Sequence, residues 1–300
     1  MTILTTRYPV VTLDGKELVP ANTTLTDDLL KQLIADGRTA SGEFYPLVEH
    51  CSVKQDLIDS LAHTPYQTIF SQQRYLTEVL DLISDTHLCK PILQMLDYFK
   101  EKDYQTYRHS LMVFCLSVLL ARMLFPDDKK LIIHSITGAS HDIGKICVPI
   151  PVLQKKTPLT SEEYRQLKHH PIAGYILLTY YLQDKEIVAT RLARDHHERM
   201  DGTGYPRGIL QTDTMVEIVM VADVYDALIM PRSYRPQPYD NRTALEEITK
   251  MAEKGKIGWE VLKALIALNR KNKSDFRDIS VSSEKRGTPP VNNVYGIIED

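Results

Sequence analysis

Residues 104–120, YQTYRHSLMVFCLSVLL, form the stretch that decides the fold. Its apolar residues recur with the period of a helix, which favours a long helix with one face in a core. Similar periodic segments follow over residues 128–140, 161–169, 172–181, 185–196, 217–229, 242–254 and 259–269. Strand patterns are nearly absent among them. We therefore predict a mainly all-α protein built on a helical bundle.

A small α+β appendage is predicted before the bundle. Residues 8–20, YPVVTLDGKELVP, alternate apolar and polar around Asp14-Gly15, a dipeptide typical of a hairpin turn. Thr26 is a suitable N-cap for a helix over Asp27–Ala35 that ends at Gly37. We divide the chain into a structural or regulatory region (1–100), the helical bundle (101–270) and a polar, loosely held tail (271–300).

The composition excludes several classes of protein. The 300 residues are 43% hydrophobic and 25% charged, and the net charge of -3 gives no reason to expect a duplex nucleic acid as partner. The longest apolar runs are too short or too interrupted to cross a membrane, and no export signal is visible. The four cysteines are far apart without a C-x-x-C pair, as in reduced cytoplasmic proteins. A structural zinc site built from cysteine is not predicted.

Seven residues within the bundle carry the chemistry: His109, His141, Asp142, His170, His196, His197 and Asp223. Neutral imidazole and carboxylate are the ligands of hard or borderline divalent metals. Seven such groups could fill two metal sites that share one carboxylate. Two adjacent metals recur in enzymes that hydrolyse phosphate esters, because one generates hydroxide and both hold the transition-state oxygens. The pattern therefore indicates a metal-dependent phosphodiesterase.

The individual residues and motifs differ in how strongly they indicate a metal or substrate site. A lone histidine such as His109 is more often a core residue than a ligand, and an isolated His-Asp pair is weak evidence. The phrase HDIGK is stronger, because Lys145 lies about one turn beyond the pair and can hold a phosphate oxygen. Histidines 196 and 197 precede the glycine-rich turn DGTGYP, which is typical of a shaped loop. Asp223 interrupts an apolar run, whereas Asp226, one turn on, is the weaker candidate.

Four motifs together resemble the HD-GYP family, a branch of the HD-domain metal-dependent phosphohydrolases. They are HDIGK at 141–145, HHP at 169–171, HHERMDGTGYPRG at 196–208 and ADVYDAL at 222–228. The resemblance covers about residues 104–251. It implies an HD-domain helical bundle that hydrolyses the bacterial second messenger cyclic di-GMP.

The resemblance also implies a role for particular residues. Asp142 would bridge two metals and take part in catalysis, with His109, His141 and Asp223 on one side and His170, His196 and His197 on the other. Lys145 would be catalytic and contact the substrate. The signature loop falls on Gly204, Tyr205 and Pro206, and further substrate contacts fall on Arg232 and Arg235.

The sequence departs from the family pattern at four positions. Some members carry a glutamate, which helps to bind a third metal, where this chain has Gln105. Ile150, Pro231 and Glu217 replace the usual Asp, Asp and Arg, which puts substrate affinity and rate in question. We therefore expect two divalent ions, iron or manganese, and linear pGpG as the main product, with GMP only after a second cut.

Two other hypotheses stay open at this point. The chain could be a signalling module with little catalysis, whose loop at residues 199–208 contacts GGDEF-domain or other proteins. It could also be a related HD phosphohydrolase that acts on other nucleotides or another cyclic dinucleotide. A homodimer is compatible with both hypotheses.

Overall fold

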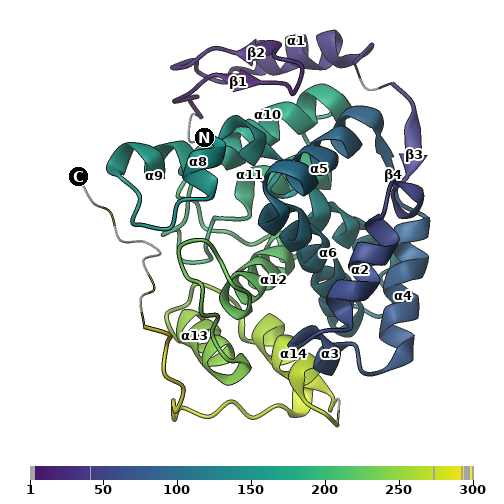
Figure 1. Cartoon of the computed structure of the whole chain (residues 1–300), viewed down its shortest axis with the longest axis vertical. Coiled ribbons are helices and arrows are strands. Elements are labelled where there is room, and N and C mark those ends of the chain that lie inside the picture. Colours follow the sequence, from purple (N-terminus) through teal and green to yellow (C-terminus); the bar gives the residue numbers. More distant parts are fainter. Residues whose placement is uncertain (1–3, 41, 273, 292, 294–297, 299–300) are drawn as a thin grey trace.

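Helix α6 (Tyr104–Leu124) lies at the centre of the molecule and organises the fold (Figure 1). It packs against α5 (Lys90–Lys102), α12 (Thr214–Ile229), α14 (Trp259–Asn269) and the 3₁₀ segment η2 (Ser135–Ser140). By length and composition α6 could cross a bilayer, but 78% of its most apolar window is buried inside the protein. That burial is typical of the core helix of a globular bundle.

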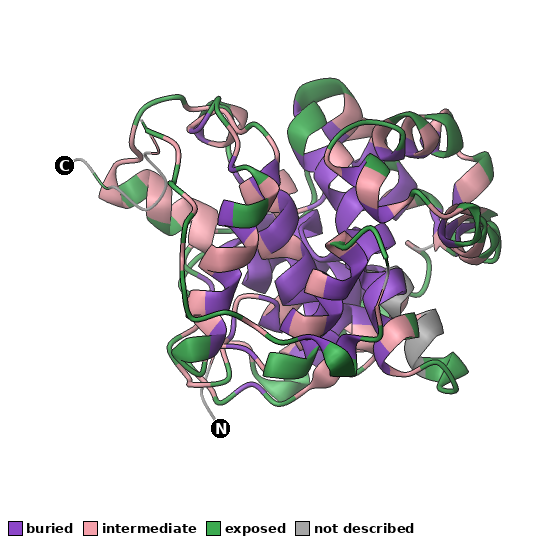
Figure 2. Ribbon diagram, turned by 90° about the horizontal axis from the view of Figure 1, so that it is seen from below, coloured by how far each residue is buried: buried purple, intermediate pink, exposed green. Residues whose placement is uncertain are grey.

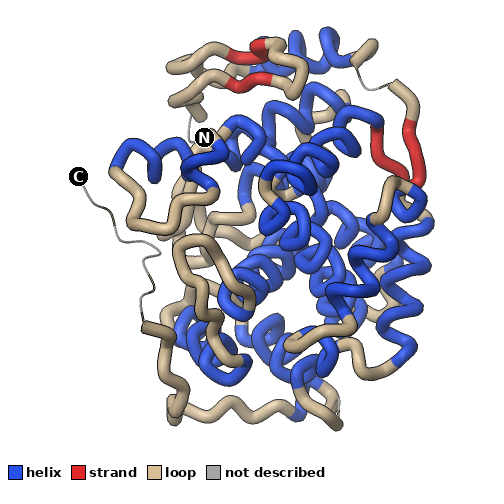
Figure 3. Tube along the Cα trace, viewed as in Figure 1, coloured by secondary structure: helices blue, strands red, loops and turns tan. Residues whose placement is uncertain are grey.

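The computed structural model describes residues 4–40, 42–272, 274–291, 293 and 298, and these residues are mainly helical (Figure 3). The mainly all-α prediction is confirmed. The other helices are α2 (Val53–Leu61), α3 (Tyr66–Ile69), α4 (Gln73–Ser84), α7 (Lys129–His134), α8 (Ile150–Leu153), α9 (Ser161–Lys168), α10 (His170–Leu182), α11 (Val188–Asp195) and α13 (Asn241–Glu253). Short 3₁₀ segments are η1 (Leu47–Glu49), η3 (Ile143–Cys147) and η4 (Phe276–Asp278).

The N-terminal hairpin and helix form as predicted. Strands β1 (Val10–Val11) and β2 (Glu17–Val19) pair antiparallel around a turn in which Gly15 has φ +84°. Helix α1 (Asp27–Gly37) begins at Thr26, whose hydroxyl accepts a hydrogen bond from the Leu29 amide. This unit lies across α10 in Figure 1, and a Cβ on Gly37 would stand 1.9 Å from the Tyr180 carbonyl oxygen. The appendage is thus seated directly on the bundle.

A second two-stranded sheet was not predicted. Strands β3 (Phe44–Pro46) and β4 (His87–Cys89) pair antiparallel along the edge of the helices that they flank. Each strand has three residues, which is too short for an alternating pattern to stand out beside the neighbouring helices.

The main hydrophobic core continues across residue 100. It joins residues from α2 and α4, such as Leu57 and Val79, with Leu116 of α6, Ile218 of α12 and Leu265 of α14, all of them buried (Figure 2). A second cluster joins the N-terminal hairpin and α1 to α10. The boundary at residue 100 therefore does not coincide with a gap in the core.

The prediction of a loosely held tail from residue 271 is wrong for its first half. Phe276 and Ile279 are buried in the main core beside α14. The amides of Arg286 and Gly287 donate hydrogen bonds to the carboxylate of Glu246 on α13. Two buried apolar side chains in an otherwise polar stretch are enough to hold it against the bundle.

Candidate metal centre

Three of the predicted ligands converge from three separate elements. His109 comes from α6, His141 follows η2, and Asp223 comes from α12. The Nε2 atom of His109 lies 3.0 Å from Oδ1 of Asp223, and the three ligand atoms lie within 4.8 Å of one another. Both histidines are buried. This first trio has the composition of a divalent metal site.

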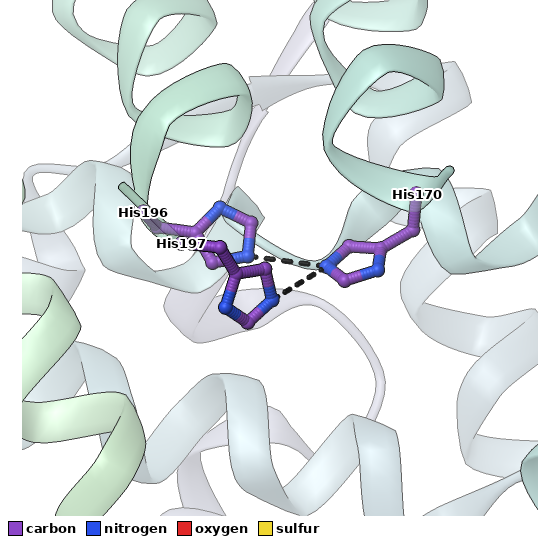
Figure 4. Close-up of side chains that lie close together, drawn as sticks. All are labelled: His170, His196 and His197. Carbon is purple, nitrogen blue, oxygen red and sulfur yellow. Dashed lines mark hydrogen bonds between the residues drawn. The ribbon is translucent and has the colours of Figure 1, made fainter. Parts of the chain in front are cut away.

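A second trio consists of histidines alone. His170 is the first residue of α10, with Pro171 next to it, and His196 and His197 follow α11. Figure 4 shows the three rings facing one another. The His170 Nε2 atom lies 3.1 Å from Nε2 of His196 and 3.1 Å from Nε2 of His197. Two imidazole ligands at right angles on one metal, with bonds of about 2.1 Å, would stand about 3.0 Å apart.

Asp142 stands between the two trios and turns one oxygen toward each. Its Oδ2 atom lies 3.3 Å from Nε2 of His141 and 3.6 Å from Nε2 of His109. Its Oδ1 atom lies 3.3 Å from Nε2 of His170 and 3.9 Å from Nε2 of His196. A carboxylate placed in this way can bridge two metal ions.

In three of these histidines, a hydrogen bond at Nδ1 decides which ring nitrogen carries the proton. The Nδ1–H groups of His141 and His170 donate to the carbonyl oxygens of Gly138 and Leu167, each at 2.6 Å. That of His196 donates to the Ala193 carbonyl at 2.9 Å. In a neutral ring whose Nδ1 carries the proton, Nε2 keeps its lone pair, and the lone pairs of all three rings point into the centre.

The protein alone does not satisfy these lone pairs. Burial lowers the pKa of His170 to about 3 and that of His196 to about 4, so both rings are neutral at pH 7. Their 3.1 Å contact therefore joins two acceptors without a proton between them. The buried Nε2 atom of His141 has no hydrogen-bond partner. A bound cation resolves both features, so the residues present fit a pair of divalent metals.

Asp226 orients His109 from behind. Its Oδ2 atom lies 2.5 Å from Nδ1 of His109, and it also accepts hydrogen bonds from Arg108, Arg232 and the Tyr66 hydroxyl. The carboxylate is completely buried. Burial alone would raise its pKa, but the two arginines and His109 outweigh burial and hold the pKa far below the usual range. Asp226 is thus a permanently charged anchor of a ligand histidine.

Two glycines are required by close packing in the motifs. A Cβ on Gly144 would lie 2.0 Å from the His170 carbonyl oxygen, so only glycine lets the HDIGK segment meet the start of α10. A Cβ on Gly204 would lie 2.4 Å from Cα of Glu198. The buried Glu198 carboxylate in turn accepts hydrogen bonds from the amides of Arg207 and Ile209. The signature loop of Gly204, Tyr205 and Pro206, the GYP loop, is therefore packed closely against the chain beside His197.

Four residues of the two trios, His109, His170, His197 and Asp223, line a cleft. Lys145 lies at its side, with Nζ 2.5 Å from Oδ2 of Asp142. Burial would raise the pKa of Asp142, but Lys145 and the surrounding histidines hold it well below its usual range. Tyr205 stacks on His197 with ring centroids 4.6 Å apart, and Lys168 lies 4.3 Å over its other face. Tyr205 therefore forms part of the cleft wall.

Arg235 lines the cleft, and its predicted contact with the substrate stays a prediction. Its guanidinium donates to the carbonyl oxygens of Ala227, Leu228 and Met230, so it caps the C-terminal end of α12. Arg232 lines the cleft, but its NH2 group lies 2.8 Å from Nδ1 of His109 and 3.1 Å from Asp226. Arg232 thus supports the centre through His109 and Asp226, whereas Arg235 holds the end of α12.

The departures from the family pattern lie away from the ligand atoms. The Gln105 side chain accepts a hydrogen bond from the Ser233 amide at 3.2 Å. Glu217 accepts from the Gly258 amide at 2.6 Å and joins α12 to the start of α14. Ile150 begins α8, and Pro231 precedes Arg232 in the loop after α12.

Several cleft residues were not singled out from the sequence. Tyr164, Tyr234 and Lys155 line the cleft. Tyr164 and Lys155 come from segments without a motif, whereas Tyr234 stands between Arg232 and Arg235, whose motif could have drawn attention to it. Asp226 was ranked below Asp223, although its place three residues further along the same helix could have marked it as a supporting residue.

Comparison with known proteins agrees with this geometry. The sequence matches the HD domain family over residues 89–261, which is more than half of the chain. The chain belongs to the HD-domain family. The assignment to its HD-GYP branch from the four motifs is confirmed as well.

Three curated relatives are cyclic dinucleotide phosphodiesterases by name. The cyclic di-GMP phosphodiesterase PA4108 of Pseudomonas aeruginosa is 37% identical over 180 residues, covering 59% of this chain and 42% of the relative. The cyclic di-GMP phosphodiesterase of Thermotoga maritima is 30% identical over 210 residues, covering 68% of this chain and 54% of the relative. The 3′3′-cGAMP-specific phosphodiesterase 3 of Vibrio cholerae is 36% identical over 149 residues, covering 49% of this chain and 32% of the relative. The chain thus spans about half or less of the length of these relatives.

Proposed function

We propose that this chain is a metal-dependent phosphodiesterase that opens cyclic di-GMP to linear pGpG. The observation that carries the proposal is the buried position of Asp142, which turns one oxygen toward each ligand trio. Four residues of these trios line the cleft. The names of the relatives and the HD-domain match support the same class of reaction.

The seven predicted ligands would hold two divalent metals, with His109, His141 and Asp223 on one, His170, His196 and His197 on the other, and Asp142 on both. When bound, such a pair supplies a hydroxide nucleophile at neutral pH and neutralises charge on the phosphoryl oxygens. Imidazole and carboxylate ligands without thiolate suit iron or manganese. Because the Gln105 side chain is held by the Ser233 amide, the structure favours two metals over three.

The residues of the chain would position the phosphodiester and its bases. The Lys145 ammonium, at the edge of the cleft, would hold a non-bridging phosphoryl oxygen as a point charge. The aromatic rings of Tyr164 and Tyr234 line the same cleft and would stack on guanine. The Tyr205 ring, covered by His197 and Lys168, would contact the substrate with its edge. The Arg199 guanidinium adds positive charge for a dianionic substrate, whereas the charge of Lys155 is paired with Glu163 at 2.5 Å. Pro206 and Gly204 would keep Tyr205 against His197.

The test is turnover of cyclic di-GMP by protein loaded anaerobically with iron or manganese, with metal content and products measured together. We expect accumulating pGpG from the wild type and neither metal nor turnover from His141→Ala/Asp142→Ala. His63→Ala is the matched control, because His63 is an exposed histidine outside the bundle motifs whose Nδ1 bonds the Asp59 carbonyl. Hydrolysis that survives in the folded double variant would contradict the proposal.

A second substrate follows from the relatives. Three of the similar proteins are named 3′3′-cGAMP-specific phosphodiesterases, and this substrate differs from cyclic di-GMP in one base. The assay should therefore include both dinucleotides at equal concentration. A kcat/KM for 3′3′-cGAMP above that for cyclic di-GMP would reassign the substrate while keeping the two-metal site.

The alternative of a signalling module rests on the outer edge of the GYP loop. Leu210 is 69% exposed beside Gly202, while Tyr205 is stacked inward on His197. Such an exposed leucine could contact a GGDEF-domain or other signalling protein. Leu210→Ser should then abolish partner binding and leave hydrolysis intact, whereas Tyr205→Ala should reduce hydrolysis. A metal-loaded protein without turnover would favour this alternative.

A further inference from the structure

A third set of metal-binding atoms lies outside the metal centre, in the N-terminal region. His50 and Cys51 lie in the turn between η1 and α2, and Asp97 lies on α5. The His50 Nε2 atom lies 2.9 Å from Oδ1 of Asp97. The Cys51 sulfur lies 3.6 Å from the same oxygen and 3.8 Å from His50 Nε2. One thiol, one imidazole and one carboxylate thus converge on a single point.

The triangle formed by these three atoms has the size of a tetrahedral zinc site. With bonds of about 2.3 Å to sulfur and about 2.0 Å to nitrogen and oxygen, tetrahedral ligands stand about 3.3–3.6 Å apart. The observed separations of 2.9, 3.6 and 3.8 Å lie within about 0.4 Å of those distances. Side-chain movements of a few tenths of an ångström would bring the three ligand atoms to the distances of a tetrahedral zinc site.

Charge around the cluster leaves the Asp97 carboxylate available. The nearest lysine, Lys100, is paired with Asp56 at 2.5 Å and also bonds Ser52. Asp56 accepts a further hydrogen bond from the Tyr107 hydroxyl at 2.7 Å. Because Lys100 is held by this network, Asp97 can direct its charge at His50 and Cys51.

We propose that His50, Cys51 and Asp97 bind one Zn²⁺ ion, with the fourth position open to water. On binding, the Cys51 thiol releases its proton to solvent and a zinc–sulfur bond forms, so no electrons are transferred. Cys51 is exposed, which lets the ion enter from solution and leaves room for a water ligand. This inference does not depend on the proposed phosphodiesterase activity.

A metal at this point would tie the turn at residues 50–51 to α5. Helix α5 packs against α6, which carries His109. The cluster was not visible in the sequence, because Asp97 lies 46 residues from Cys51 and the cysteines show no paired spacing. The bound ion would stabilise the packing of the N-terminal helices on the bundle, and this stabilisation would increase with metal occupancy.

Titration with Co²⁺ of the full chain, without a purification tag and under a thiol-free reductant, tests the proposal. A cobalt–thiolate site gives an intense near-ultraviolet charge-transfer band, which the metal centre cannot give because none of its seven ligands is a cysteine. We expect a band that reaches a plateau as Co²⁺ is added, at up to three ions bound per chain because the metal centre fills as well, that disappears when Zn²⁺ is added, and that is absent in Cys51→Ser. His170→Ala should keep the band while it loses metal from the centre.

Cys147→Ser is the matched control, because the Cys147 thiol donates to the Val11 carbonyl in another part of the fold. The band should survive in this variant. No band in the wild type, or a band that survives Cys51→Ser, overturns the assignment. A further variant, Asp97→Asn, should weaken Co²⁺ binding at least tenfold in the titration, and an unchanged affinity would remove Asp97 from the site.

Discussion

Replacing Asp226 by asparagine should weaken one metal site and destabilise the fold at the same time. The side chain keeps its shape but loses the charge that faces Arg108 and Arg232. Removing one partner from a buried ion pair costs about 3–5 kcal/mol, because the remaining charge stays buried without compensation. The side chains of Arg108 and Arg232 are 14% and 10% exposed to solvent, so some water can reach their charges. We therefore expect a loss of unfolding free energy at the lower end of this range, about 3 kcal/mol.

The same substitution loosens His109, because asparagine can donate to Nδ1 as well as accept from it. Loss of such a supporting carboxylate lowers metal affinity by about 10–100-fold. The site that includes His109 should therefore empty first, while His170, His196 and His197 keep their metal. Thermal unfolding and metal analysis after dialysis measure the two effects, and the midpoint should fall by roughly 6–12 °C.

The stability loss also has a defined pH dependence. The pKa of Asp226 is held far below its unfolded value, so the charge stabilises the fold above about pH 4 and this contribution is lost as the pH falls further. The gap between wild type and variant should narrow in acid. Tyr66→Phe is the control, since it removes one hydrogen bond to Asp226 and keeps the charge, at a cost of about 1 kcal/mol. An Asp226→Asn variant with wild-type stability and both metals would refute the reasoning.

Three further predictions concern the loop, the lysine and a half-buried acid, Glu217. Gly204→Ala should lower metal content and destabilise by about 1–3 kcal/mol or more, because its Cβ would overlap Glu198; an unchanged unfolding midpoint would contradict this packing. Lys145→Met should keep both metals and lower kcat by about 10²-fold, measured with saturating substrate; metal loss instead would show a structural role. Burial raises the pKa of Glu217, which bonds the Gly258 amide, so its contribution to stability is present below the unfolded pKa and lost as pH rises. Glu217→Gln should therefore gain stability over wild type as pH increases in urea unfolding, and a gap independent of pH would contradict this.

The fold class and the ligand set followed from the sequence because each leaves a local pattern. Helical periodicity marks α6 and α12, and the motif order brings His141, Asp142 and His196 into one interpretation. The hairpin around Gly15 was readable for the same reason. The structure adds that each Asp142 oxygen faces a different trio, which spacing in the sequence cannot show.

Other features depend on contacts between distant segments, which one sequence does not reveal. Arg235 was expected at the substrate because of its motif, and its guanidinium also reaches three helix-end carbonyls. The tail was expected to be loose from its polar composition, yet Phe276 is buried beside α14. The β3–β4 pair and the His50–Cys51–Asp97 cluster join residues more than 40 positions apart.

The hydrogen bond from Tyr66 to Asp226 affects how this protein can be dissected. Tyr66 belongs to α3, well before the HD-domain match begins at residue 89, and it is completely buried. A fragment trimmed to the family boundaries would remove a donor from the carboxylate that positions a metal ligand and would expose part of the core. Exchange of N-terminal regions between relatives should therefore change activity by itself, without any signal being sensed. The region before residue 89 is better treated as a built-in part of the helical bundle than as an exchangeable input module.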